Sequence, residues 1–204
     1  HFPSEMAAVA PARLRLVFDE LFRLEIALAV RKHRQVTAAE GIAHTADAGL
    51  VEAFLGSLPF AITGAQQRAI DEIRFDMRSA HPMHRLLQGE VGSGKTVVAM
   101  AALLTAVQGG YQGAVMAPTE VLAEQHYLGL APLGALVGVR MAILTGSSAG
   151  REQVLAAVAS GTVDVVVGTH ALIQEGVHFA RMGVAVVDEQ HRFGVHQRVQ
   201  LKEK

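Results

Sequence analysis

The sequence contains no cysteine, no tryptophan and no asparagine, and it has only four lysines. The lack of cysteine excludes disulfide frameworks and cysteine-ligated zinc sites. The lack of asparagine excludes the Asn-Lys-x-Asp motif with which regulatory GTPases recognise guanine. The Leu-Ser-Gly-Gly-Gln signature of transporter ATPases is also absent. These absences remove several classes of protein before any motif is considered.

Neither positive nor negative charge dominates, because the sequence has 18 Lys and Arg residues and 19 Asp and Glu residues. This balance argues against a general polycation, although it leaves room for a local nucleic-acid groove. The longest largely apolar run, 97–107, is too short to cross a bilayer, and no signal peptide opens the chain. We therefore expect a cytoplasmic protein. The chain starts with His1 rather than Met and ends at Lys204, so we expect it to be a piece of a longer protein.

One stretch of the sequence matches the phosphate-binding loop pattern G-x-x-x-x-G-K-[ST] of nucleoside triphosphatases. Its glycines allow positive φ and leave the backbone bare, so that N–H groups can face a phosphate. The lysine is expected on the β- and γ-phosphates of ATP, and the hydroxyl on Mg²⁺. The helix that follows would add its N-terminal dipole. The predicted nucleotide-binding residues are Gly89, Glu90, Val91, Gly92, Ser93, Gly94, Lys95 and Thr96.

Two acids follow the apolar run 184–187 and suit the second half of such a site. Asp188 is predicted to bind Mg²⁺, and Glu189 to orient or deprotonate the attacking water. Lys95, Asp188 and Glu189 are thus the candidate catalytic residues. His191 lies just beyond them and is either a sensor of the γ-phosphate or an ordinary loop histidine. Gln66 is either a reader of the adenine edge or a surface residue.

The chain from residue 60 onward alternates between apolar strand patterns and helical patterns. Strands are predicted at 85–87, 113–117, 139–144, 163–167 and 184–187, with helices between them. Continuous apolar strands separated by helices predict an α/β fold, with a parallel sheet sandwiched by helices. In such sheets ligands bind beyond the carboxyl ends of the strands. The predicted polar clusters all fall at those ends.

The pattern of residues 1–58 differs from that of the rest of the chain. It predicts a helical spacer that packs on a neighbouring domain. Apolar residues recur at helical spacing from Leu14 to Phe22, and we expect a helix from Pro11 to Arg34. The basic cluster 31–34 is either a phosphate-backbone contact or a solvated helix end. A second short helix is predicted at 48–58. Residues 59–204 form the second predicted domain, which we expect to be truncated at its C-terminal end.

Five stretches together resemble the superfamily-two helicases and translocases, and within them the RecG branch of bacterial branched-DNA helicases. They are 58–66, 89–96, 117–126, 168–172 and 188–195. The resemblance implies a RecA-like motor lobe of the P-loop NTPase class. It also implies an ATP-dependent DNA helicase that remodels stalled forks and Holliday junctions in recombination and repair. ATP and Mg²⁺ are the implied cofactors.

The resemblance also implies roles for individual residues. Gln66 corresponds to the adenine-sensing glutamine of the family. Small hydroxyl residues and glycines at strand ends would hold the DNA backbone, a role that carries no base sequence. These candidate DNA-binding residues are Pro118, Thr119, Thr145, Gly146, Ser147, Gly168, Thr169 and His170. Gln190 and His191 are candidates for coupling the nucleotide site to a neighbouring surface.

The implied partners are branched or forked duplex DNA and two further domains of the full-length protein. One is a second motor lobe that supplies an arginine to the transition state, and the other is a wedge domain. We expect a monomer, and we expect the piece 1–204 alone to hydrolyse ATP poorly. Two alternatives stay open, namely a double-stranded DNA translocase of the transcription-repair coupling type and a nucleotide-gated DNA-binding module without turnover.

Overall fold

The computed structural model describes residues 5, 7, 9–38, 41–45, 47, 49–146, 150–174 and 176–189 of the chain. The chain divides between Gly41 and Ile42 into two compact units. The domain boundary that we expected near residue 58 lies farther along the chain than this division. Among the helices described, none is long and apolar enough to span a membrane.

The first unit contains one long helix, α1 (Val9–Ala38). This helix begins two residues before the helix expected from Pro11 to Arg34 and ends four residues after it. Phe18 and Phe22 stack on its surface with ring centroids 5.5 Å apart. Within this unit the large apolar side chains of α1 stay exposed, namely Val9, Leu14, Leu16, Val17, Phe18, Leu21, Phe22, Leu24, Ile26, Leu28 and Val30.

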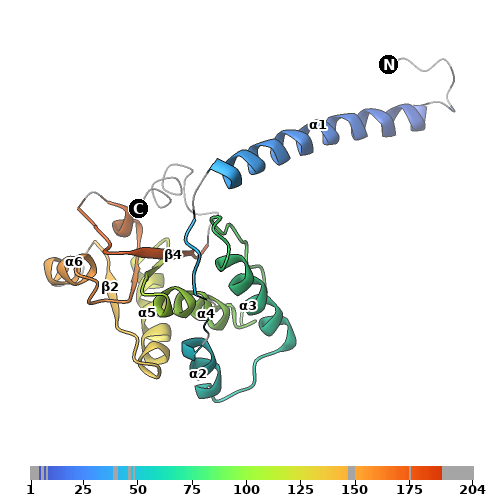
Figure 1. Ribbon diagram of the computed structural model, residues 1–204. Coiled ribbons are helices and arrows are strands. Elements are labelled where there is room, and N and C mark those ends of the chain that lie inside the picture. The colour runs from blue at the N-terminus through green and yellow to red at the C-terminus, as the bar shows by residue number, and fades with distance from the viewer. Residues whose placement is uncertain are drawn as a thin grey trace. The chain divides into compact units, whose positions relative to one another are not determined.

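The second unit is built on a parallel sheet of four strands in the order β2-β3-β1-β4. Figure 1 labels the two edge strands, β2 and β4. The strands are β1 (Gln112–Met116), β2 (Met141–Leu144), β3 (Val165–Gly168) and β4 (Met182–Val187). Every side chain of β1 and β3 is buried, as expected for central strands with both faces covered. The predicted α/β fold is therefore confirmed.

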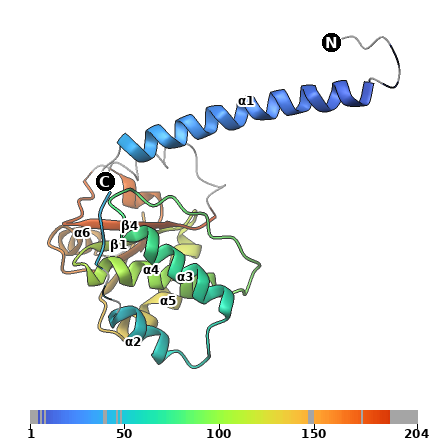
Figure 2. The same cartoon turned by 45° about the vertical axis from the view of Figure 1, so that its right-hand side comes forward.

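Successive side chains of the central strands enter two separate cores. Val115, Val165 and Val167 pack with the helices α2 (Gly49–Ser57), α3 (Gly64–Met77), α4 (Lys95–Gln108) and α5 (Glu120–Ala135). Met116 and Val166 pack on the opposite face with α6 (Arg151–Ala159) and the 3-10 helix η2 (His170–Ile173). Figure 2 shows α3 and α4 side by side, in agreement with their packing contacts. The strand period of two thus produces a sandwich with helices on both faces.

The helix α2 packs as part of the α/β unit, although it was expected in the spacer. Val51 and Phe54 lie fully inside the larger core. The backbone N–H of Leu50 also donates to the side chain of Gln108 at the end of α4 (2.7 Å). These contacts attach α2 to the helix that follows the phosphate loop.

The strand that we expected at 85–87 is absent, and this prediction was wrong. Arg85 instead binds two carboxylates of α3, those of Glu72 and Asp76. Leu86 is 74% exposed, so no neighbouring strand or helix covers it. The arginine contacts hold this segment on α3, and no strand among the described residues pairs with it. An apolar pair alone does not make a strand when no partner supplies the ladder of hydrogen bonds.

A buried histidine attaches the segment 41–45 to the sheet. The ring of His44 packs edge-on against Tyr111, with centroids 5.2 Å apart. Its backbone N–H donates to the carbonyl of Met77 (2.8 Å). Burial lowers the pKa of His44 from its usual value of 6.5, and a hydrogen bond with the backbone of Gly183 only partly opposes this effect. The imidazole is therefore neutral at pH 7.

The burial of Phe54 predicts that α2 stabilises the α/β unit. We expect Phe54→Ala to lower the free energy of unfolding by about 3–5 kcal/mol, because it leaves a cavity in the core. Phe75→Ala is the matched control, since Phe75 lies on α3 with 75% of its surface exposed. The control is expected to change stability by less than about 0.5 kcal/mol. Urea denaturation of both variants measures the difference, and equal effects would contradict a core role for α2.

The lowered pKa of His44 predicts a loss of stability in mild acid. Well above the unfolded-state pKa of about 6.5 the residue is neutral in both states and costs nothing. As the pH falls toward the folded-state pKa, the unfolded state binds the proton more readily, so the free energy of unfolding decreases. We expect a smaller decrease between about pH 7.5 and pH 5 in His44→Gln, which keeps a donor but does not titrate. Urea denaturation at both pH values tests this, and an unchanged decrease would refute the assignment to His44.

Candidate functional site

The phosphate loop occupies the turn that leads into α4. Gly92 and Gly94 have φ values of 82° and 78°, a region in which residues with a Cβ are strained. The loop is closed by a hydrogen bond from the Ser93 N–H to the carbonyl of Glu90 (3.2 Å). A Cβ at Gly89 would lie 2.6 Å from the Ser93 hydroxyl oxygen. The glycines are therefore required by the shape of the loop, as the motif predicted.

Lys95 is the first residue of α4 and turns back into the loop. Its ammonium donates to the carbonyls of Gly89 and Glu90, each at 2.8 Å. A lysine at this position thus holds its charge beside the backbone that would cradle phosphates. Thr96 follows and is exposed at the start of the helix, where its hydroxyl can act as an oxygen ligand.

The start of α4 lies at the carboxyl edge of the sheet, as the lengths of α4, of β1 and of the turn between them require. The helix has 14 residues and spans about 21 Å. It runs antiparallel to β1, which spans roughly 17 Å, and a short turn at 109–111 joins the two. The helix packs against both β1 and β4. Its N-terminal dipole and the phosphate loop therefore face the edge where the strands end.

Gln66 contacts the phosphate loop directly. Its side-chain oxygen accepts from the backbone N–H of Thr63 (2.8 Å), while the Thr63 hydroxyl accepts from the Gln66 N–H (3.2 Å), which forms a capping box. Its amide nitrogen donates to the carbonyl of Ser93 (2.9 Å). A Cβ at Gly94 would clash with the same amide. Thr63 is thus the N-cap of α3, and Gln66 connects α3 to the loop.

The carboxyl ends of all four strands are in register and end at the same edge of the sheet. Met116 pairs with Gly168 on one side and with Val187 on the other, and Leu144 pairs with Gly168. The N–H of Ala117 donates to the carbonyl of Gly168 (2.8 Å), just past the end of β1. This register gathers the segments that follow the strands at one edge, namely 117–119, 145–146, 169–170 and 188–189.

Asp188 and Glu189 lie at this edge, directly after β4. The Asp188 N–H donates to the carbonyl of Met116 (2.9 Å), which fixes the backbone. Its carboxylate oxygen Oδ2 lies 2.7 Å from Nε2 of His126 on α5. Glu189 has a φ of 52° and is the only residue other than glycine with positive φ in the described part of the chain. Strained backbone of this kind occurs often at functional sites.

The donor set at this edge suits Mg²⁺. Hydroxyl and carboxylate oxygens, as in Thr96 and Asp188, are the ligands that this ion prefers. Among the residues that the structure describes, no group of three or more His, Asp or Glu side chains forms a metal cage. Magnesium usually takes only one or two carboxylates from the protein, with the rest of its shell filled by water and phosphate oxygens.

Two of the candidate DNA-binding threonines use their hydroxyls inside the protein. The Thr119 hydroxyl accepts from the N–H of Leu122 (3.3 Å) and caps α5. The Thr169 hydroxyl accepts from the N–H of Ala171 (3.4 Å) and caps η2. Thr169 and Thr145 are both buried, whereas Thr119 is exposed. The other exposed or half-buried candidates at this edge are Pro118, Gly146 and His170.

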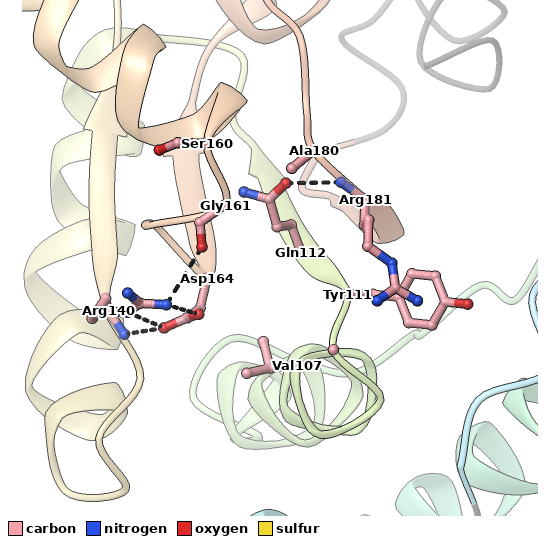
Figure 3. A pocket seen from close by; sticks show the side chains of 10 residues that line it. Val107, Tyr111, Gln112, Arg140, Ser160, Gly161, Asp164, Ala180 and Arg181 are labelled. Carbon is pink, nitrogen blue, oxygen red and sulfur yellow. Dashed lines mark hydrogen bonds and ion pairs between the residues drawn. The ribbon is translucent and has the colours of Figure 1, made fainter.

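A pocket of 330 Å³ lies at the opposite, amino edge of the sheet (Figure 3). The ion pair of Arg140 with Asp164 (2.7 Å) is on one side, and the guanidinium of Arg181 stacks on Tyr111 at 4.5 Å on the other. The buried side chain of Gln112 lies between them and accepts from the Arg181 N–H (3.1 Å). None of the site residues predicted from the sequence lines this pocket.

Comparison with known proteins identifies the family. The model of the DEAD/DEAH box helicase family matches residues 63–204, more than half of the chain. The chain belongs to the DEAD/DEAH box helicase family. Its phosphate loop and its paired acids both fall inside the matched range.

This helicase chain is similar over its whole length to proteins named ATP-dependent DNA helicase RecG. It is 49% identical to the one from Synechocystis sp. and 48% identical to the one from Streptococcus pneumoniae. The chain spans 25% and 30% of the length of these two relatives. The solved structure of RecG bound to a three-way DNA junction matches with a TM-score of 0.85 and 46% identity, over 95% of this chain and 27% of that one. The predicted resemblance to the RecG branch is therefore confirmed.

The structure adds His126 to the residues of this DEAD/DEAH helicase chain that the sequence singled out. His126 shares one face of α5 with Ala123 and Leu130, which are buried. Their helical spacing in the sequence is a signal that His126 points inward. Nothing in the local sequence connects it to Asp188, 62 positions away. Three predicted residues lie outside the described residues, namely Ser147, Gln190 and His191.

The left-handed backbone of Glu189 predicts a measurable strain. We expect Glu189→Gly to be more stable than Glu189→Ala by about 1 kcal/mol, because both remove the side chain but only glycine adopts this φ freely. Urea denaturation of the two variants measures the difference. If the alanine variant were equally stable or more stable, the backbone at 189 would not be strained.

Proposed function

We propose that this chain is the ATP-binding motor lobe of a helicase that uses ATP hydrolysis to remodel branched DNA. One observation carries the proposal: the level strand ends and the start of α4 bring the phosphate loop, the paired acids and the candidate DNA contacts to one edge of the sheet. The RecG relatives are named ATP-dependent DNA helicases, and the similar solved structure is that of RecG bound to a three-way DNA junction. Both names support this function.

The nucleotide is proposed to bind with its phosphates in the loop 89–96. Backbone N–H groups and the start of α4 would face the phosphate oxygens, and the Lys95 ammonium would exchange its two carbonyl partners for them. Gln66 would present its amide to the adenine edge from its position beside Ser93. All of these groups are neutral or positive, which suits a ligand as anionic as ATP.

Hydrolysis is proposed to depend on the pair of acids. Thr96 and Asp188 would hold Mg²⁺, which when bound neutralises charge on the β- and γ-phosphate oxygens. Glu189 would accept a proton from the attacking water. Its strained backbone would aim the carboxylate independently of the neighbouring Asp188, which is held by the hydrogen bond between its N–H and Met116.

The DNA backbone is proposed to lie across the same edge. Pro118, Thr119, Gly146 and His170 present exposed or half-buried surface there. Thr145 and Thr169 are buried, so we propose that they shape the turns while backbone N–H groups supply the donors. Contacts of this kind bind phosphates without reading bases, as a motor that moves along DNA requires.

The remaining parts of the motor are proposed to belong to the full-length protein. A second lobe would close on this one and supply an arginine to the transition state, and a wedge domain would separate the strands of the DNA. Residues 188–191 would report the state of the nucleotide to that lobe. We propose that the full-length protein works as a monomer in the cytoplasm.

We expect Lys95→Ala and Asp188→Asn in the full-length protein to lower DNA-stimulated ATP hydrolysis by at least about 100-fold. The first removes a positive charge from the phosphates, and the second removes a charged ligand of the Mg²⁺ that would neutralise them. Unwinding of a three-way junction should fall in parallel. Arg74→Ala is the control, since Arg74 lies on α3 away from the loop and should leave both rates within about twofold.

The same assays distinguish the two functional classes. A motor needs hydrolysis, so unwinding that survives Lys95→Ala would exclude the proposed role. If Glu189→Gln abolished hydrolysis but left junction unwinding intact, the chain would act as a nucleotide-gated binding module instead.

A further inference from the structure

One contact of the candidate metal ligand comes from the helix that begins at the proposed DNA surface. Nε2 of His126 lies 2.7 Å from Oδ2 of Asp188, with the two side chains 26% and 36% exposed. Within the described part of the chain, His126 is the only side chain bonded to this carboxylate. The contact joins α5 to the end of β4, two elements far apart in the sequence.

The helix between the two sites is a rigid connection. The Thr119 hydroxyl caps α5 at its first turn, beside the half-buried Pro118. His126 lies seven residues farther on, about 10 Å along the helix axis. Ala123 and Leu130 on the same face are buried against the sheet. A displacement of the start of α5 would therefore reach the imidazole through a continuous helix and not through a loop.

One oxygen of the Asp188 carboxylate can still bind a metal in the described part of the chain. There, the only side chain bonded to this carboxylate is that of His126, and it contacts Oδ2. Donors that hold a ligating carboxylate from outside fix its orientation, and their loss commonly weakens metal affinity by 10–100-fold. An imidazole that carries its hydrogen on Nε2 donates to Oδ2 and leaves the other carboxylate oxygen for the ion.

We propose that His126 is a positioning residue that orients Asp188 for Mg²⁺ and couples this orientation to DNA held at the start of α5. The inference rests on the proposed function, because it takes Asp188 as the metal ligand and 118–119 as a DNA contact. His126 itself touches neither nucleotide nor DNA in this scheme and acts through Asp188. DNA binding thereby tunes the affinity of the nucleotide site for its metal.

The test measures how much Mg²⁺ the full-length protein needs to bind a fluorescent ATP analogue, with and without three-way junction DNA. We expect His126→Ala to raise the half-saturating Mg²⁺ concentration by about tenfold. His126→Gln, which keeps an N–H donor, should recover most of this loss. DNA should shift the Mg²⁺ midpoint of the wild type and of His126→Gln but not that of His126→Ala. Gln125→Ala, an exposed neighbour on α5, is the control and should behave as the wild type.

Two further variants separate the possible failures. His126→Phe keeps the ring volume without a donor, so it replaces His126→Ala if the smaller side chain impairs folding. Asp188→Asn tests the proposed function itself. If it raises the Mg²⁺ midpoint while His126→Ala and His126→Phe leave it unchanged or lower it, the positioning role is refuted and the motor function stands. If Asp188→Asn has no effect, the metal assignment fails, and the role of His126 fails with it.

Discussion

The backbone hydrogen bonds that hold β1 in register with β3 and β4 determine the geometry of the whole site. A slip of one residue would move Asp188 by about 3.3 Å and exchange the core side chains between the two faces of the sheet. The two cores resist such a slip, because Val115 and Val166 enter opposite faces of the sheet and are both buried. A Cβ at Gly168 would clash with the carbonyl of Leu144, so the level strand ends also depend on a bare backbone there. The same apolar packing that stabilises the fold therefore fixes the positions of the residues that follow the strands.

Much of the fold could be predicted from the sequence, because its signals are local. Apolar runs predicted β1 to β4, and the pattern between them predicted α4 and α6. Threonine is a residue type that local sequence favours as an N-cap, and the Thr63 hydroxyl accepts the capping bond of α3. The phosphate loop could be located because glycine is needed at fixed spacings, and the positive φ values of Gly92 and Gly94 agree with that need. The roles of the site residues toward nucleotide and DNA stay predictions.

The features that the sequence did not predict all depend on partners distant along the chain. The segment at 85–87 has the composition of a strand, but Arg85 binds the acids of α3 and no strand pairs with it. The contact of His126 with Asp188 depends on how α5 crosses the sheet, which no local pattern contains. Burial of the Thr169 side chain likewise follows from the packing of η2 rather than from its residue type.

Gln66 serves two structural purposes, since it completes the capping box of α3 and binds the carbonyl of Ser93. Its replacement would weaken a helix and release a loop even if no nucleotide were ever recognised. The structural contacts alone account for a glutamine at this position, so its presence is weak evidence of preference for adenine. Base preference is better judged by offering ATP and GTP to an unaltered protein than by removing the side chain.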